Sequence, residues 1–212
     1  MKIAKIEARA YTVPVAIPLT GTRLHLPFAL VTIETDDGLR GTGLCGGMDH
    51  VQDAAVFVER KIAPSIIGED PMNTERIWQT LLTRQNYRRF TGFWSSAVSA
   101  VDIALWDIKG KALGQPIARL IGGAAPEVPA YVTFGVSEYS REELAEVART
   151  LVAEGHTRLK MVVGGLKHPS VKEEKPTASD RSKRFLPKDI REDARRVRAV
   201  REAIGPDIEL MI

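Results

Sequence analysis

Apolar and polar residues alternate along the first 45 residues in a way that predicts an antiparallel meander. The first strand is expected over residues 2–13, and Pro14 and Pro18 are then expected to break regular structure. A β-branched strand over residues 27–35 is followed by Asp36-Asp37-Gly38, a turn that is typical of hairpins. The return strand completes the meander.

Helical spacing of apolar residues follows the meander. One apolar stripe covers residues 51–61, and a turn at residues 70–73 leads into a second helix through Leu82. The strongest periodicity lies in residues 97–112, and Pro116 begins a further short helix. Strands thus come first in this part of the chain, and helices follow them.

The pattern changes at about Val128. Apolar strands are expected over residues 128–134, 157–163 and 208–212. Between them lie a helix that Ser140 and Glu143 begin with the spacing of a capping box, and a second helix over residues 189–204. Strands that alternate with helices in this way are typical of parallel βαβ units.

The length of this second region bears on its completeness. A closed (β/α) barrel needs about 200–250 residues, whereas 85 residues run from Val128 to Ile212. The chain also stops inside an apolar strand, and an exposed parallel edge is a liability. We therefore expect the N-terminal part of a larger protein or a truncated gene product; a complete three-stranded α/β sheet is the alternative.

Composition and charge exclude several classes of protein. No apolar run reaches the length of about 20 residues that spans a bilayer, and the single Cys45 excludes a disulfide framework. The net charge of +3 is local, because residues 167–188 hold seven basic and three acidic side chains. No nucleic-acid-binding motif accompanies this basic loop. We expect a cytoplasmic protein that binds neither nucleic acid nor membranes.

The segment 97–111, with Gly114-Gln115-Pro116-Ile117 and Leu120-Ile121-Gly122-Gly123 after it, resembles the signature of the mandelate racemase and muconate lactonizing enzyme family of the enolase superfamily. We interpret this signature as scaffold. Its small residues, Ala97, Ser99, Ala100 and Ala104, allow close helix packing, and Asp102 and Asp107 are expected to form structural hydrogen bonds.

The resemblance implies a fold and a chemistry. Residues 1–127 would form the N-terminal α+β capping domain, an antiparallel meander plus helices, and residues 128–212 the first βα units of an incomplete (β/α) TIM-type barrel, with a basic loop at 164–188. In the family, carboxylates at the ends of the third, fourth and fifth barrel strands hold Mg²⁺, which stabilises the enolate formed when a proton α to a carboxylate is removed.

The first of these carboxylates would follow Ile212, and Glu209 is not the matching residue. The resemblance thus implies Mg²⁺ for the full-length protein and no metal ligand in this chain, which alone is expected to bind no catalytic metal and to be inactive.

The second barrel strand of the family commonly carries Lys-x-Lys, and the matching residues here are Lys160-Met161-Val162. The first lysine of the motif is present as Lys160, but Val162 stands at the position of the second. The second lysine is usually the base, and valine cannot accept a proton. This pattern resembles acid-sugar dehydratases, a class of lyase in which one base removes the α-proton, and Lys160 would stabilise the substrate carboxylate or the enolate. A racemase or cycloisomerase of the same superfamily, and a non-catalytic gene fragment or interaction module, are the alternatives.

The resemblance also suggests residues that bind a small anionic hydroxy-acid. Arg23 and His25 match the first mobile loop of the cap, residues 14–26, and His50 matches the second. Thr133 ends the first barrel strand, where it would donate to a substrate hydroxyl. A homo-oligomer is left open, because members of such families often form symmetric assemblies.

Overall fold

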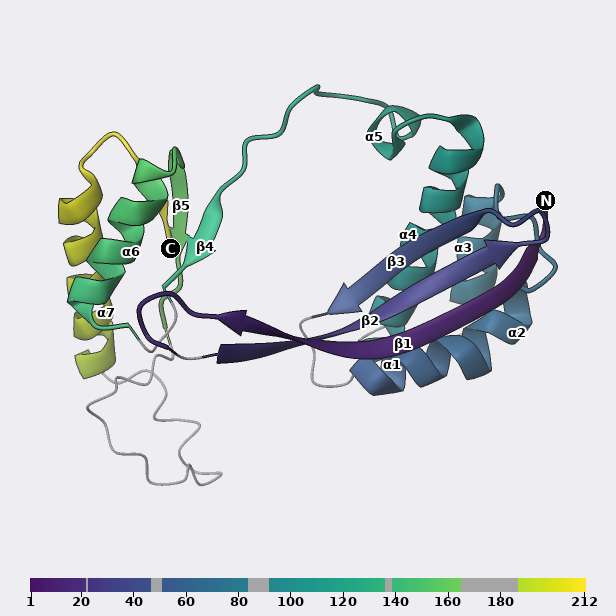
Figure 1. Ribbon diagram of the computed structural model, residues 1–212, viewed down its shortest axis with the longest axis horizontal. Coiled ribbons are helices and arrows are strands. Elements are labelled where there is room, and N and C mark those ends of the chain that lie inside the picture. Colours follow the sequence, from purple (N-terminus) through teal and green to yellow (C-terminus); the bar gives the residue numbers. More distant parts are fainter. Residues whose placement is uncertain (22, 47–50, 84–91, 136–138, 165–186) are drawn as a thin grey trace. The chain divides into compact units, whose positions relative to one another are not determined.

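The computed structural model describes residues 1–21, 23–46, 51–83, 92–135, 139–164 and 187–212. Contacts divide the chain into two units (Figure 1): residues 1–16 with 23–126, and residues 17–22 with 127–212. Each unit contains a three-stranded sheet, antiparallel in the first and parallel in the second.

The first unit opens with the antiparallel sheet in the order β1-β2-β3, whose strands are Ile3–Ala16, Arg23–Thr35 and Arg40–Gly46. Its helical elements are α1 (Val51–Phe57), the π-helix η1 (Val58–Ile62), α2 (Ala63–Ile66), α3 (Thr74–Thr83), α4 (Phe93–Leu113) and α5 (Ile117–Leu120). The expected meander followed by helices is confirmed.

Helix α4 packs closely on β3 because glycine faces it. A Cβ added at Gly43 would lie 2.0 Å from the carbonyl oxygen of Ala100, and one added at Gly41 would lie 2.2 Å from that of Ala104. Both alanines are fully buried, as the signature predicts for a packing helix, whereas Ser99 is exposed and takes no part. The two backbones therefore approach to a distance that excludes any larger residue on β3.

Side chains from the helices cover the outer edges of the antiparallel sheet. Glu59 accepts a hydrogen bond from the backbone N–H of Ala8 at 3.1 Å on the β1 edge. On the β3 edge, Asp107 accepts from the N–H of Thr42 at 2.9 Å, and Lys111 donates to the carbonyl of Arg40 at 2.8 Å. The structural hydrogen bond expected of Asp107 is confirmed, and both edges lose open sites for strand addition.

The expectation that Pro14 ends the first strand is wrong, because β1 continues to Ala16 and pairs Pro14 with His25. The N–H of Ala8 points to the free edge of the sheet, so the backbone N–H groups of the even-numbered β1 residues after it point to the same edge. A proline there removes no ladder hydrogen bond. The region expected to form the first cap loop is consequently shorter, since strand residues extend to Ala16 and resume at Arg23.

The second unit contains a parallel sheet in the order β4-β5-β6, with strands Val132–Phe134, Arg158–Met161 and Glu209–Met211. Its helices are α6 (Arg141–Ala153) and α7 (Pro187–Ile204), which lie side by side (Figure 1). The predicted capping box is confirmed, because the Ser140 hydroxyl accepts from the N–H of Glu143 at 3.1 Å and the Glu143 carboxylate accepts from the N–H of Ser140 at 2.8 Å. The βα order expected of a barrel start is therefore present.

The strands of this unit are shorter than the apolar runs that predict them. Val128 is 83% exposed and precedes β4 rather than joining it. The helix-facing sides of the strands carry the buried residues Phe134, Leu159 and Met161. The basic loop expected at 164–188 lies almost wholly outside the described residues.

Candidate functional site

The free face of the parallel sheet is the side opposite to its buried residues. Successive side chains of a strand point to opposite faces, and Leu159 and Met161 are buried beside α6 and α7. Lys160 therefore lies on the other face. The strand register places Thr133, Lys160 and Met211 in one row across β4, β5 and β6.

Lys160 lies at the centre of this row, on the middle strand, and is partly exposed. Its Nζ is 5.6 Å from the centre of the Tyr131 ring, a distance at which a cation is attracted to the face of an aromatic ring. No carboxylate of the described residues forms an ion pair with Lys160.

The neighbouring row carries a neutralised charge. Arg158 pairs with Glu209 in the register, and its Nε lies 2.9 Å from the carboxylate. Arg158 and Lys160 are two residues apart and share a face. Because Glu209 compensates Arg158, Lys160 is the cation of these two rows that has no carboxylate partner in the part of the chain that the structure describes. Glu209 thus has an ion-pair partner on the neighbouring strand.

Val162 extends the same face one row further. Its backbone N–H donates to the carbonyl of Phe134 at 2.9 Å, which continues the parallel pairing beyond β5, and its side chain is 38% exposed. An isopropyl group neither holds nor accepts a proton. The row that would carry a second lysine therefore offers only hydrocarbon from β5.

The structure brings together two of the expected site residues, Thr133 and Lys160, because the register pairs them directly. Thr133 is exposed, so its hydroxyl is accessible from the free face. Arg23 and His25 lie at the start of β2, opposite Ala16 and Pro14, and both are exposed. They are two residues apart and so share a face of the hairpin. His50 lies outside the described residues.

Three neighbours of Lys160 escape prediction from the motif alone: Tyr131, Arg158 and Glu209. The alternation of strand residues holds the signal for the first two, since each lies two positions before an expected site residue in the sequence. Glu209 requires the register between β5 and β6, which depends on the chain between those strands. Sequence spacing does not supply that register.

The described residues contain no group of three or more His, Cys, Asp or Glu side chains that could hold a metal ion. The donor set that Mg²⁺ prefers, several carboxylate oxygens around one point, is thus not assembled within the described ranges. Among the described helices, none is long and apolar enough to cross a membrane.

Comparison with known families decides the identity of the chain. The family model described as "Mandelate racemase / muconate lactonizing enzyme, N-terminal domain" matches residues 3–122, and the model "Enolase C-terminal domain-like" matches residues 143–212. The chain belongs to the mandelate racemase/muconate lactonizing enzyme family. The resemblance inferred from the signature is confirmed, and the two matches follow the order of the antiparallel and parallel sheets.

Relatives in this family carry out more than one reaction. The chain is 32% identical, over 99% of its length and 54% of the relative's, to the 3,6-anhydro-alpha-L-galactonate cycloisomerase of Streptomyces coelicolor. It is 34% identical to the D-mannonate dehydratase of Novosphingobium aromaticivorans, over 61% of this chain and 30% of that protein. Cycloisomerases and dehydratases are thus both among its relatives.

A solved structure adds a racemase to this group. The crystal structure of a racemase from Streptomyces coelicolor A3(2), with bound magnesium, matches with a TM-score of 0.80 and 30% identity, over 98% of this chain and 54% of that one. The chain thus spans about half the length of the relatives that it matches from end to end. The comparisons establish the family and the fold. They do not distinguish between the three reactions, so that choice depends on the side chains of the site.

Proposed function

We propose that the protein to which this chain belongs removes a proton α to the carboxylate of a small acid sugar and eliminates water, giving a 2-keto-3-deoxy acid. The observation that carries the proposal is that Lys160 and Val162, two residues apart, lie on the same free face of the parallel sheet. A cation is kept where the substrate carboxylate binds, and the position of a second base is hydrocarbon. Elimination needs a base on one side of the α-carbon, whereas racemisation needs one on each side.

In this proposal residues 1–127 are the cap and residues 128–212 the start of the barrel. Lys160 attracts the substrate carboxylate and stabilises the negative charge that grows on its oxygens as the α-proton leaves. Thr133, in the same row, donates a hydrogen bond to a substrate hydroxyl. Arg23, His25 and His50 contribute polar contacts from the cap.

The remaining groups of the reaction are placed outside the described residues. One base takes the α-proton, an acid protonates the departing β-hydroxyl, and the enol that results tautomerises to the ketone. The relatives are about twice as long as this chain, which supports locating the base and the Mg²⁺ ligands in the part that the chain does not contain. On this view the chain alone is inactive.

A cycloisomerase is the second candidate. It is favoured by the relative that matches 99% of the chain at 32% identity, which is a cycloisomerase of an anhydro sugar acid. The site does not distinguish the two reactions, because a single base also suffices for a cycloisomerisation that begins at one face of the α-carbon.

Steady-state kinetics on the complete reading frame, with Mg²⁺ and a panel of aldonic and aldaric acids, test the proposal. We expect a 2-keto acid from at least one substrate, and a loss of about 10²–10³-fold in kcat/KM for Lys160→Met, the usual effect of removing one electrostatic stabiliser. Lys109→Met is the matched control, because the Lys109 Nζ also lies over an aromatic ring, 4.8 Å from the centre of Trp106, but on α4.

The control is expected to keep wild-type kinetics. Absence of a keto acid across the panel, or equal activity of Lys160→Met and the wild type, would contradict the proposal. A lactone or ring-opened isomer in place of the keto acid would favour the cycloisomerase.

A further inference from the structure

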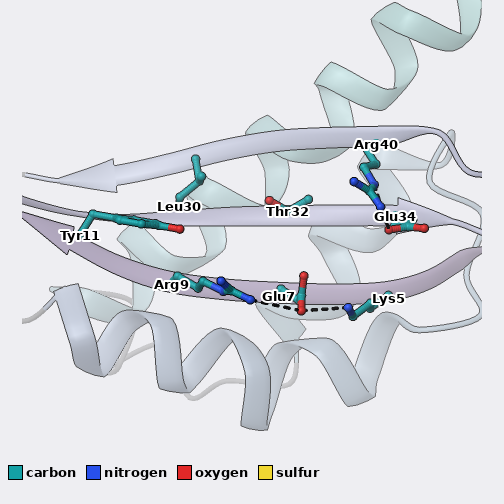
Figure 2. Close-up of a pocket in the computed structure, with 8 residues that line it drawn as sticks. All are labelled: Lys5, Glu7, Arg9, Tyr11, Leu30, Thr32, Glu34 and Arg40. Atoms are coloured by element: carbon teal, nitrogen blue, oxygen red, sulfur yellow. Dashed lines mark hydrogen bonds and ion pairs between the residues drawn. The ribbon is translucent and has the colours of Figure 1, made fainter.

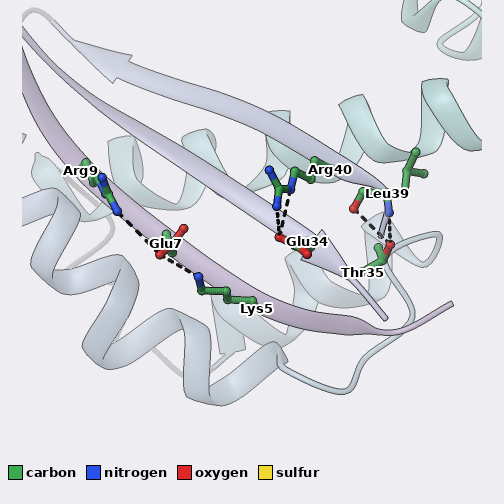
Figure 3. A network of polar contacts seen from close by, with 7 residues as sticks. All are labelled: Lys5, Glu7, Arg9, Glu34, Thr35, Leu39 and Arg40. Atoms are coloured by element: carbon green, nitrogen blue, oxygen red, sulfur yellow. Dashed lines mark hydrogen bonds and ion pairs between the residues drawn. The ribbon is translucent and has the colours of Figure 1, made fainter. Parts of the chain in front are cut away.

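Two groups of charged side chains differ in what they bind. On the face of the antiparallel sheet that points away from its helices, Lys5 lies 2.9 Å from Glu7 and Arg40 lies 3.0 Å from Glu34 (Figure 3). These four side chains line a depression on the sheet (Figure 2) and are partly exposed. Ion pairs of this kind contribute little to stability. The second group lies on α7, and its members bind the backbone of other elements.

Two side chains of α7 reach the chain that leaves the carboxyl ends of β4 and β5. Asp193 accepts a hydrogen bond from the N–H of Gly164 at 3.0 Å, three residues after the end of β5. Arg196 donates through Nη1 to the carbonyl oxygen of Tyr139 at 2.5 Å, five residues after the end of β4. One helix therefore holds the backbone beyond both strands.

Arg196 is suited to hold a fixed position because it is 2% exposed, and a buried guanidinium depends on protein groups in place of water. Burial lowers the pKa of Arg196, and the carboxylates of Asp193 and Glu192 oppose that effect. Glu192 in turn lies 2.9 Å from Nε of Arg141, the first residue of α6. Two cations and two carboxylates thus link α7 to the start of α6.

These contacts lie at the edge of the sheet that carries the candidate site. Lys160 is four residues before Gly164 on β5, and Thr133 is two residues before Gly135, which follows β4. Gly135 has a φ of +91°, and a Cβ there would lie 3.2 Å from Cγ of Met161, so β4 ends in close contact with β5. In barrels of parallel strands, substrate binds at the carboxyl ends of the strands, whereas the opposite edge serves stability.

The other end of α7 makes a similar contact at the amino edge of the sheet. Arg201 donates through Nη1 to the carbonyl oxygens of Gly205 and Ile208, at 2.7 Å and 2.8 Å, just before β6. The same type of residue on the same helix thus binds backbone at both edges. Arg196 does so at the edge with the candidate site, and Arg201 at the edge without it.

We propose that Asp193 and Arg196 are positioning residues, which hold the backbone beyond β4 and β5 and so fix the spacing between the hydroxyl of Thr133 and the ammonium group of Lys160. This inference rests on the function proposed above for Thr133 and Lys160. Both α7 side chains act through the backbone that they hold. A shift of about 1 Å in a positioned group is enough to weaken its action severely.

Steady-state kinetics of the complete protein, with the acid that it converts, test the proposal through KM. We expect Arg196→Met and Asp193→Ala each to raise KM about tenfold, with a smaller change in kcat, because Thr133 and Lys160 contact the substrate before any bond breaks. A variant that is merely less stable contains less active enzyme, which lowers the apparent kcat and leaves KM unchanged. Arg196→Lys keeps a donor and Asp193→Asn keeps an acceptor, so both should restore most of the wild-type KM.

Arg201→Met is the matched control and is expected to keep the wild-type KM, since its partners lie at the amino edge. An equal rise of KM in Arg196→Met and Arg201→Met would overturn the proposal. So would a wild-type KM in both Arg196→Met and Asp193→Ala, a result that leaves the proposed function standing because the wild type still forms its product. If Arg196→Met does not fold, Asp193→Ala decides, since Asp193 is partly exposed.

Hydrogen exchange of the complete protein tests the contact without a substrate. The N–H of Gly164 should exchange about fivefold faster in Asp193→Ala than in the wild type, the effect expected from the loss of one hydrogen bond. An unchanged rate overturns the proposal. A wild type that converts none of the acids contradicts the proposed function, and faster exchange in Asp193→Ala would still support the holding of this backbone by α7.

Discussion

The two sheets of this chain have the same number of strands and use their uncovered faces differently. On the antiparallel sheet, the charged side chains of the free face pair with one another, as Lys5 does with Glu7 and Arg40 with Glu34. On the parallel sheet, Arg158 is paired with Glu209, whereas Lys160 faces only an aromatic ring among the described residues. The described residues thus compensate the charges on the free face of the antiparallel sheet and leave one cation of the parallel sheet without a carboxylate partner.

The covered faces differ as well. The antiparallel sheet meets α4 through glycine, with backbone against backbone, while the parallel sheet meets α6 and α7 through large side chains such as Leu159 and Met161. Contact between backbones tolerates no added atom, whereas contact between side chains can repack. Changes at the first interface should therefore cost more than changes in the second unit.

The largest effect is expected from Gly43→Ala. The new methyl would overlap the Ala100 carbonyl, at 2.0 Å, and the unfolding free energy of the first unit should fall by about 3 kcal/mol. Hydrogen exchange of the β3 and α4 amides under increasing urea measures that free energy unit by unit. Gly46→Ala is the control, because the nearest atoms to its methyl would be Phe28 Cβ, at 3.2 Å, and the Pro27 carbonyl oxygen, at 3.4 Å. Equal stability of the two variants would contradict the close-contact interpretation.

A smaller and pH-dependent effect is expected from Asp107→Asn. Burial, the largest single influence, raises the pKa of Asp107, but the hydrogen bonds and charge of Lys111 together with the donors of Thr42 outweigh it and lower that pKa overall. A carboxyl whose folded pKa is depressed stabilises the fold above its unfolded pKa, about 3.9, and loses this effect as the pH falls through the folded value.

We therefore expect the variant to be about 1 kcal/mol less stable than the wild type at pH 7 and equally stable at the acid end. Urea unfolding of both proteins at several pH values measures the difference. Asp207→Asn is the matched control, because Asp207 is an exposed residue before β6, and this variant should be as stable as the wild type at pH 7. A difference that persists below the folded pKa would show that shape, not charge, is what Asp107 contributes.

In the second unit, Ser140→Ala is expected to lower the unfolding free energy by a similar amount at neutral pH. Loss of the cap that holds the N–H of Glu143 should destabilise α6 by about 1 kcal/mol. Faster hydrogen exchange in the first turn of α6 would report it, and Ser140→Asp should restore protection because its carboxylate also accepts from that N–H. No rescue by aspartate would indicate that the serine acts by another contact.

The sequence predicts those parts of the fold whose signal is local. Helix α4 follows from the spacing of its apolar residues, and α6 from the capping box at Ser140. The signal fails where tertiary context decides: Pro14 is tolerated because β1 is an edge strand, and Ser99 is exposed within a segment of small residues. On α7, Arg196 is 2% exposed and donates to the carbonyl of Tyr139, a buried position that the polar composition of that helix hides.

The candidate site shows the same division. Lys160, Thr133 and Val162 follow from a motif and from strand alternation, which are local. The Arg158–Glu209 ion pair depends on the register of two strands separated by a helix, and the ring of Tyr131 over Lys160 depends on a side-chain conformation. Positions of the first kind are readable from spacing alone, and contacts of the second kind require the structure.

The most direct test of the central claim, that the Lys160 face carries a cation but no base, is proton exchange at the α-carbon. The complete protein is incubated in deuterium oxide with each α-epimer of its substrate acid, and proton NMR follows the α-hydrogen of the substrate and the hydrogens at C3 of the keto acid. The account predicts keto acid from one epimer, no interconversion of the epimers, and recovery of exchange from the second face only in Val162→Lys. Deuterium entering the α-position of both epimers in the wild type would contradict it.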